Sequence, residues 1–290
     1  MIPAVEADRP EIEAFLDARL PRAMFPRANL AHYGMVSPGG AGGHRLAMRF
    51  WLQREGGAVT DVLGATAEGF LLPACPTGPW AAAAGALTGE SVGALIGPAE
   101  EVAPLRAALG LGQAPGELDE VQPHFLLDLA ALEVPGGPGR LVPFADAPEA
   151  LVTGWLRDYF TETLGTPLDL AVVEAGRAFR QAAEAGSHAV LMEGDEALAM
   201  TGQNARLPSI VQIGGVYTPP ALRGRHHARR AVALHLAEAQ ARGVTRATLF
   251  AAGPPAIRAY EALGFRRIGD WALCRFAAPQ RVRPDGAAHG

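Results

Sequence analysis

The stretch Ile213-Gly-Gly-Val-Tyr-Thr-Pro-Pro-Ala-Leu-Arg-Gly-Arg-His-His-Ala-Arg-Arg-Ala-Val232 decides the fold of the chain. A strand-like run ends at a Pro-Pro turn, an Arg/Gly/His loop follows, and an Ala/Leu-rich helix begins at once. This order directs backbone N–H groups and a helix N-terminus at one point in space, where a phosphate group is well held. The stretch therefore predicts a site for a phosphate-bearing ligand.

A second motif follows one expected strand later, Gly253-Pro-Pro-Ala-Ile-Arg-Ala-Tyr-Glu-Ala-Leu-Gly-Phe265. Taken in this order, the two motifs resemble those of the Gcn5-related N-acetyltransferase (GNAT) family. The acetyl-CoA loop of that family reads Arg/Gln-x-x-Gly-x-Gly/Ala, and this chain has Arg223-Gly-Arg-His-His-Ala228 at that place. The later family motif reads Asn-x-x-Ala-x-x-x-Tyr-x-x-x-Gly-Phe, and the chain matches all but its first residue. The resemblance carried by these motifs covers about residues 140–276.

The resemblance implies that acetyl-CoA is the cosubstrate. In the family the loop holds the pyrophosphate, and the strand before the loop bonds the pantetheine arm and the thioester carbonyl. The residues that these roles select are Val216, Tyr217, Thr218, Arg223, Gly224, Arg225, His226, His227 and Ala228, with Gly253 where the family has an Asn that holds the pantetheine arm. Loop amides, a helix dipole of about half a positive charge and charge-assisted arginine bonds all favour phosphate here.

Tyr260 is the expected catalytic residue. In the family this tyrosine stands near the coenzyme sulfur and protonates the leaving thiolate. A thiol with a pKa near ~8.5 leaves readily, so the expected contribution is modest. The implied reaction transfers an acetyl group from acetyl-CoA to a primary amine, on a small molecule or a protein, within one ternary complex.

Two positions depart from the family pattern, and no general base is assigned. His226 stands where the family usually has a glycine that lets phosphate approach the backbone, and Gly253 replaces the family's Asn. Glu174, on a helix expected over the acceptor cleft, is one candidate base, whereas the acidic residues of the turn at 193–196 are expected in solvent. A second hypothesis is therefore a sensor or scaffold that binds acyl-CoA without turnover. A Rossmann-type nucleotide site is excluded, because the loop lacks Gly-x-Gly-x-x-Gly and has no acidic ribose partner.

The densest cluster of breakers, Pro135-Gly-Gly-Pro-Gly139, divides the chain into two halves that look like divergent copies of one unit. Leu109-Gly-Leu111 falls on Leu263-Gly-Phe265, and Leu95-Ile96 falls on Leu249-Phe250. Each of the latter pairs ends a strand before a proline and a short Ala-rich helix. The alignment predicts a structural duplication.

The first half lacks the phosphate loop. Pro76 to Val92 has no Arg-x-x-Gly pattern and is too short for both a loop and a full helix, and Arg106 stands where the second half has Tyr260. We expect a degenerate GNAT-like domain at 1–135, a GNAT acetyltransferase domain at 140–278, and a flexible tail at 279–290. The expected fold class is α/β (α+β), with a mixed, mostly antiparallel central sheet flanked by helices in each domain. The first domain would complete the acceptor site, brace the active domain or form the surface of a homodimer.

Apolar periodicity and breaker positions predict the individual elements. The expected helices are 10–20, 100–109, 148–164, 170–185, 227–242 and 255–263. The expected strands are 44–54, 58–65, 70–72, 92–96, 124–132, 141–144, 188–192, 197–202, 209–217, 247–251 and 266–276.

Composition bounds the remaining possibilities. The 290 residues are 49% hydrophobic and 19% charged, which is enough apolar material for a sizeable core. A net charge of -5 argues against general nucleic-acid binding. Cys75 and Cys274 are too few for a disulfide framework and lack neighbours with which to bind a metal. Without a signal-peptide pattern or an apolar run of ~18 residues, we expect a cytoplasmic protein with no metal and no membrane partner.

Overall fold

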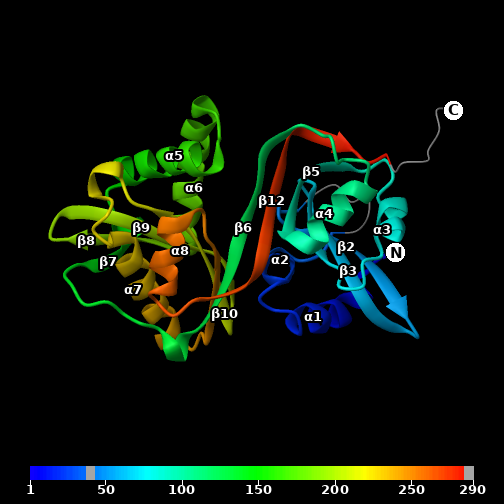
Figure 1. Ribbon diagram of the computed structural model, residues 1–290, viewed down its shortest axis with the longest axis horizontal. Helices are drawn as coiled ribbons and strands as arrows, with labels where there is room; N and C mark the ends of the chain where they lie inside the picture. The colour runs from blue at the N-terminus through cyan, green and yellow to red at the C-terminus, as the bar shows by residue number, and fades with distance from the viewer. Residues whose placement is uncertain (37–42, 284–290) are drawn as a thin grey trace. The chain divides into compact units, whose positions relative to one another are not determined.

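The computed structural model describes residues 1–36 and 43–283, which form two compact units (Figure 1). Unit 1 holds Met1–Gln122 together with the chain from Gly269 onward, and unit 2 holds Pro123–Ile268. Within the described ranges, no helix has the length and apolarity needed to cross a membrane.

Unit 2 is built on a mixed sheet in the order β7-β8-β9-β10-β11-β6. All neighbours in this sheet are antiparallel except β10 and β11, which are parallel. The strands are β7 (Arg140–Pro143), β8 (His188–Glu193), β9 (Glu196–Leu207), β10 (Ile210–Tyr217), β11 (Arg246–Phe250) and β6 (Gly116–Asp128).

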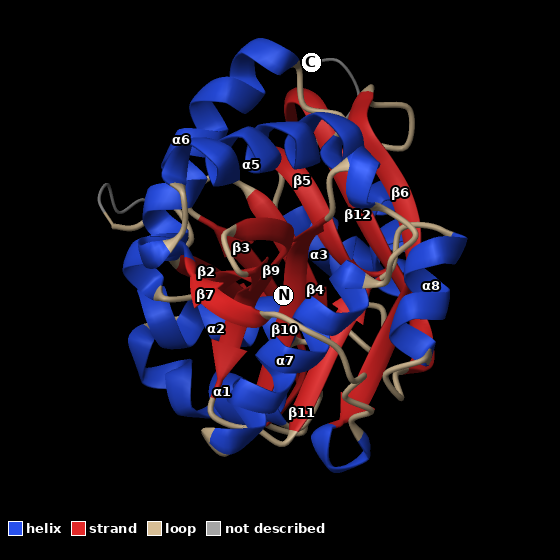
Figure 2. Cartoon of the chain, turned by 90° about the vertical axis from the view of Figure 1, so that its left-hand side faces the viewer, coloured by secondary structure: helices blue, strands red, loops and turns tan. Residues whose placement is uncertain are grey.

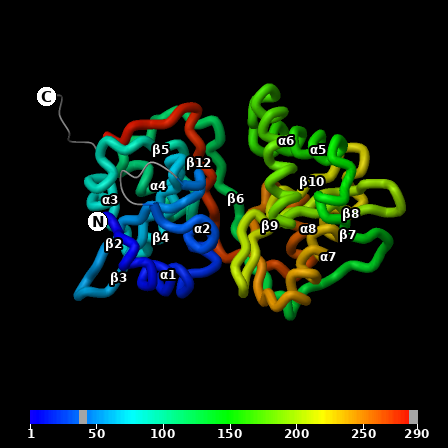
Figure 3. The backbone as a smooth tube through the Cα atoms, turned by 180° about the vertical axis from the view of Figure 1, so that it is seen from behind, coloured from blue at the N-terminus to red at the C-terminus, as the bar shows by residue number. Residues whose placement is uncertain are grey.

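Two helix pairs cover the opposite faces of this sheet (Figure 3). The first pair is α5 (Glu149–Leu164) and α6 (Leu168–Ala185), and the second is α7 (His227–Ala241) and α8 (Pro254–Glu261). Residues of β8 alternate between the two faces: Val190 packs with the α5–α6 core and Leu191 with α7. This alternation follows from the period of two along a strand, and it assigns each side chain of the sheet to one helix pair.

Unit 1 repeats the same topology, with sheet order β1-β2-β3-β4-β5-β12 and one parallel pair, β4 with β5. Its strands are β1 (Ile2–Pro3), β2 (Met48–Glu55), β3 (Ala58–Thr66), β4 (Phe70–Ala74), β5 (Ser91–Pro98) and β12 (Arg266–Arg281). Its helices are α1 (Arg9–Asp17), α2 (Met24–Tyr33), α3 (Trp80–Ala86) and α4 (Ala99–Ala108). One apolar cluster joins α1 and α2 to the sheet, and a second joins α3 and α4. The expected duplication and fold class are confirmed.

The last strand of each half belongs to the sheet of the other unit. β6 and β12 are long, with 13 and 16 residues (Figure 2). The chain enters unit 2 at Pro123 within β6 and returns to unit 1 at Gly269 within β12. Each crossing carries a residue that interrupts a regular ladder, because Pro123 lacks an N–H group and Gly269 has a φ of 151°. The two units therefore do not match the expected domains at 1–135 and 140–278, because β6 joins the sheet of unit 2 and β12 joins the sheet of unit 1.

The expected tail at 279–290 also needs correction in its first part. Pro279 to Arg281 belong to β12, where Gln280 pairs with Val92 of β5. Val282 is buried in the core of unit 1, and its N–H and C=O groups bond to Glu90 and Gly89. Burial of this apolar side chain explains why the strand continues through a polar, proline-containing stretch. Residues 284–290 lie outside the described chain.

Candidate functional site

The parallel ladder between β10 and β11 is short, and β10 continues beyond it. The last ladder pair joins Ile213 to Leu249, whereas β10 runs on to Tyr217 beside β9. The register with β9 shifts between Gly214 and Tyr217, and Gly215 has a φ of 60°. The bulge expected from the Gly-Gly pair is therefore present. Backbone groups of β10 beyond Ile213 are left without ladder partners on the β11 side.

Two side chains absent from the predicted site meet this bulge from the α5–α6 face. The Gly215 N–H group donates a hydrogen bond to the hydroxyl of Tyr159 on α5. The ring of His188, on β8, lies across Gly202 of β9, and its Nε2 would be 2.9 Å from a Cβ atom placed on Gly215. Gly202 is thus a glycine for a packing reason, and Gly215 for both a packing and a backbone reason. The Gly214-Gly215 pair signalled the bulge in the sequence, but nothing local indicated which distant residues would reach it.

The loop after β10 contains backbone N–H groups that have no hydrogen-bond acceptor within helix α7. A single turn at Pro220–Leu222 leads to Gly224, which has a φ of 78°. The first helical bond of α7 runs from the Arg230 N–H group to the His226 carbonyl at 3.1 Å, so the amides of residues 224–228 lack helical acceptors. This is the arrangement that binds an anion at a helix N-terminus.

His226 adopts a left-handed backbone conformation, which glycine tolerates best. It is the N-cap residue of α7, with φ 63° and ψ 15°, and it is the one non-glycine residue with a positive φ in the described chain. The left-handed region costs an L-residue roughly 1–2 kcal/mol. The imidazole is exposed and caps no backbone group of the helix. The loop therefore holds a left-handed turn at His226 at a cost in strain.

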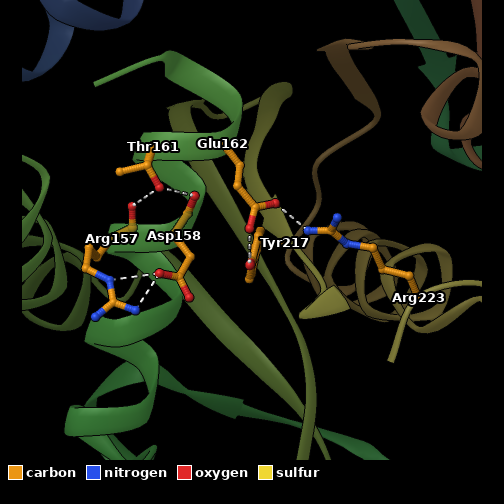
Figure 4. Close-up of polar contacts among 6 residues, drawn as sticks. All are labelled: Arg157, Asp158, Thr161, Glu162, Tyr217 and Arg223. Carbon is orange, nitrogen blue, oxygen red and sulfur yellow. Dashed lines mark hydrogen bonds and ion pairs between the residues drawn. The ribbon is translucent and has the colours of Figure 1, made fainter. Parts of the chain in front are cut away.

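Arg223 is held by an acidic residue of α5 (Figure 4). Its guanidinium bonds the Glu162 carboxylate at 2.6 Å and the Thr218 carbonyl at 2.9 Å, and it lies 5.5 Å from the centre of the Tyr217 ring. The Tyr217 hydroxyl donates to the other oxygen of Glu162 at 3.0 Å. The hydrogen bond from Arg223 lowers the pKa of Glu162, and burial followed by Glu162 raises the pKa of Tyr217 to about 12. This triad joins α5 to the end of β10 and to the loop.

The other arginines of the expected basic patch separate into different roles. Arg230 bonds the carbonyls of Pro135 and Pro138 at 2.5 and 2.7 Å, so it anchors the breaker segment to α7. Arg229 is half-buried on the same helix. Arg225 is exposed and makes no hydrogen bond or ion pair with any residue that the structure describes. Arg225 is therefore the arginine of this patch best placed to meet an incoming phosphate.

Tyr260 is buried on α8, on the other side of the sheet from Tyr159. Its ring packs edge-to-face with Phe265 at 6.0 Å, and its hydroxyl makes no hydrogen bond within the described part of the chain. Burial, together with the nearby Tyr159, raises the pKa of Tyr260. The hydroxyl therefore stays protonated at neutral pH and can act as a proton donor.

The remaining predicted residues lie at the edges of the site. His227 and Ala228 form the first turn of α7, and Val216 and Thr218 flank Tyr217 at the end of β10. Gly253 is the N-cap of α8, with a φ of 84°; it is exposed, and a side chain there would meet little. The Asn of the family could not adopt this φ without strain.

The acidic residues considered as bases are in solvent or paired. Glu174 forms an exposed ion pair with Arg177 on its own helix, α6. The acidic residues of the turn at 193–196 are exposed, as expected. Within the residues that the structure describes, no group of acidic, histidine or cysteine side chains could hold a metal ion.

Comparison with known proteins agrees with this geometry. Residues 150–265 match the model of the acetyltransferase (GNAT) family. A tandem GNAT protein from the clavulanic acid biosynthesis pathway superposes with a TM-score of 0.52 at 17% identity, covering 98% of both chains. A GCN5-related N-acetyltransferase-like protein from Streptococcus suis has a TM-score of 0.53 at 13% identity, covering 94% of this chain and 100% of its own. Among curated proteins, none matches the chain.

Together these findings define the class of protein as a tandem GNAT fold. The structural likenesses, at this identity, concern the fold, and the family match covers the part of unit 2 that carries the loop and Tyr260. Unit 2 therefore contains a GNAT domain, which indicates acetyltransferase activity in general.

Proposed function

We propose that unit 2 transfers an acetyl group from acetyl-CoA to a primary amine within a ternary complex. The observation that carries this proposal is the open end of β10, where unpaired backbone groups lead into a loop of free amides. A strand end of this kind suits an extended pantetheine arm, and the loop suits a pyrophosphate. The family match across the same residues supports acetyl-CoA as the ligand.

Most of the predicted residues have a place in this proposal. Backbone groups of Val216, Tyr217 and Thr218 would hold the pantetheine arm and the thioester carbonyl. The amides of residues 224–228 and the guanidinium of Arg225 would bind the pyrophosphate. A donor aimed at the thioester oxygen stabilises the negative charge that develops there in the transition state.

Tyr260 would give its proton to the sulfur as the thioester breaks. The amine nitrogen attacks the thioester carbon, the C–S bond breaks, and the thiolate takes the proton of the phenol. The raised pKa of the phenol makes it a weak acid, which fits a modest rather than a dominant contribution. Binding both substrates in one orientation would supply most of the rate.

The proposal is tested by measuring thiol release from acetyl-CoA with a panel of small amines and peptide N-termini. The expected result is release that requires one class of amine and falls in Tyr260→Phe. The acyl-CoA sensor is the second candidate, because Glu162 already neutralises Arg223 and Gly253 offers the ligand no side chain. Absence of release with every amine, while acetyl-CoA still raises the melting temperature, would favour the sensor and reject the enzyme.

A further inference from the structure

Gly202 on β9 leaves room for the His188 side chain to reach from β8 to the bulge in β10. Along the sheet, His188 of β8 pairs with Gly202 of β9, and Gly202 pairs with Gly214 of β10. A side chain on Gly202 would collide with the imidazole, and one on Gly215 would lie 2.9 Å from its Nε2. The ring therefore crosses one whole strand to reach the place where the β10–β11 ladder has ended.

The hydrogen bonds of Ser187 orient the imidazole. The Ser187 hydroxyl donates to the Ala182 carbonyl at 3.5 Å and lies 2.8 Å from His188 Nδ1. In the tautomer that the proposal below uses, Nδ1 carries the ring proton and donates it to the Ser187 oxygen, which leaves Nε2 unprotonated. Nε2 makes no hydrogen bond with a described residue.

The surroundings keep this imidazole neutral. Burial, and then the positive charge of Arg206 on β9, lower the pKa of His188 to about 4. The other titratable group that acts on it is His235 on α7, across the sheet. Tyr159 on α5 bonds Gly215 at the same bulge. No carboxylate in the described chain is among the groups that shift the pKa of His188. In the tautomer with the proton on Nδ1, the neutral ring presents a lone pair on Nε2, beside the backbone proposed to hold the thioester.

We propose that His188 is the general base of unit 2 and that its Nε2 accepts the proton lost by the acceptor amine. This inference rests on the proposed acetyl transfer. The neutral amine attacks the thioester carbon, its N–H proton passes to Nε2, and the C–S bond breaks as the thiolate takes the proton of Tyr260. The proton on His188 then returns to the phenolate through solvent, so that both residues are restored.

A weakly basic imidazole can serve this step because its basicity changes during the reaction. As the amine adds, the thioester oxygen becomes negatively charged, and an adjacent negative charge raises the pKa of an imidazolium. The proton is therefore accepted only when the adduct has formed. The carboxylates of Glu174 and of the turn at 193–196 are exposed, so the charge that develops on the thioester oxygen would not raise their basicity in this way.

The central test is His188→Gln, which keeps a polar side chain but removes a titratable base. We expect kcat for thiol release to fall about 100- to 10,000-fold, with KM for acetyl-CoA and the acetyl-CoA-induced rise in Tm unchanged. Gly202→Ala, which displaces the same ring, should lower kcat in the same way. His235→Gln is the matched control, since His235 is also a buried histidine with a pKa lowered chiefly by burial, on the α7 side. Retention of kcat within threefold in a folded His188→Gln protein would overturn the proposal.

A second readout does not depend on finding the amine. In imidazole ¹⁵N spectra, addition of acetyl-CoA should shift the Nε2 signal of His188 and leave that of His235 in place. An unmoved His188 signal in a protein that binds acetyl-CoA overturns the assignment, whatever the amine panel gives. A shifted signal without turnover of any amine instead rejects the acetyl transfer, and with it the base role, while retaining His188 in the acyl site.

Discussion

The parallel pair β4–β5 of unit 1 and the pair β10–β11 of unit 2 occupy the same place in the same topology, but their open ends are filled differently. In unit 1 the ladder pairs only Phe70 and Leu71 of β4 with β5. Beyond this ladder, carboxylates of unit 1 accept hydrogen bonds from the backbone N–H groups that follow β4. Glu101 accepts the Cys75 N–H group at 2.6 Å, and Asp61 accepts the Thr77 N–H and hydroxyl groups at 2.9 and 2.6 Å.

In unit 2 the backbone at the corresponding end meets a hydroxyl and an imidazole, while the nearby carboxylate of Glu162 bonds the side chains of Tyr217 and Arg223. The helix that follows has 15 residues in α7, against seven in α3. Buried backbone donors must find a partner. The comparison indicates that unit 1 satisfies them permanently from within, whereas unit 2 leaves its loop amides for a ligand.

The largest expected effect on acetyl-CoA affinity comes from closing the open end of unit 2. Gly215→Ala adds a Cβ at φ 60°, 2.9 Å from His188 Nε2. We expect the affinity for acetyl-CoA to fall about tenfold, since loss of about 1.4 kcal/mol of backbone hydrogen bonding to the ligand changes the Kd by that factor. Gly186→Ala is the matched control: its φ is 56° and nothing lies within 4 Å of the added atom. Equal affinities in calorimetric titrations of the two variants would contradict the open-end account.

Removing the carboxylate that fills the end of the β4–β5 ladder in unit 1 should lower the stability of the protein and leave its function unchanged. Glu101→Ala leaves the buried Cys75 N–H group without an acceptor, which should lower the free energy of unfolding by about 2 kcal/mol. Urea denaturation measures this loss. The affinity for acetyl-CoA and kcat should stay at the wild-type values, and a change in either would mean that unit 1 takes part in ligand binding.

Tyr260→Phe should separate chemistry from binding. The phenol makes no hydrogen bond within the described chain, so its removal should leave stability and KM for acetyl-CoA unchanged. We expect kcat to fall about tenfold, because a thiolate is a good leaving group. A kcat unchanged by the substitution would remove Tyr260 from the reaction.

His226→Gly should relieve strain in the loop that unit 1 lacks. Glycine tolerates the φ of 63°, so the free energy of unfolding should rise by up to about 1 kcal/mol. The reverse change, Gly224→Ala at φ 78°, should lower it by a similar amount. Thermal unfolding of both variants gives the comparison, and a destabilised His226→Gly would show that the imidazole makes a stabilising contact.

The smallest expected effect concerns the ion pair over the loop. Glu162→Gln removes a negative charge that competes with phosphate for Arg223, and both partners are more than 40% exposed. KM for acetyl-CoA should fall about two- to threefold at low salt, with the difference lost at high salt. Glu174→Gln, which breaks a similarly exposed pair on α6, is the control. A rise in KM for Glu162→Gln alone would mean that the carboxylate orients Arg223 for the ligand.

Much of this fold could be predicted from the sequence, because its signals are local. The strand, loop and helix around Arg223 and the helix of Tyr260 follow from periodicity, prolines and glycines, and each lies within a few residues of its expected bounds. The sequence pattern does not predict helix α2, because this helix contains Pro26 and is only weakly amphipathic. The short helix α3 was seen only as a stretch too small for a full helix.

The remainder depends on contacts between distant segments. Periodicity predicts strands at 124–132 and 266–276. Each strand could pair with the sheet of either half, so the sequence does not show that β6 pairs with β11 and β12 with β5. Tyr159 and His188 reach the bulge from α5 and β8, each far from Gly215 along the chain. Their roles follow from tertiary packing, which no local pattern records.

Calorimetric titration of the whole chain with acetyl-CoA tests most directly whether unit 2 alone holds the site. We predict one molecule bound per chain, with affinity preserved in Glu101→Ala and weakened about tenfold in Gly215→Ala. Two molecules per chain, or an affinity lost in Glu101→Ala and retained in Gly215→Ala, would contradict the account.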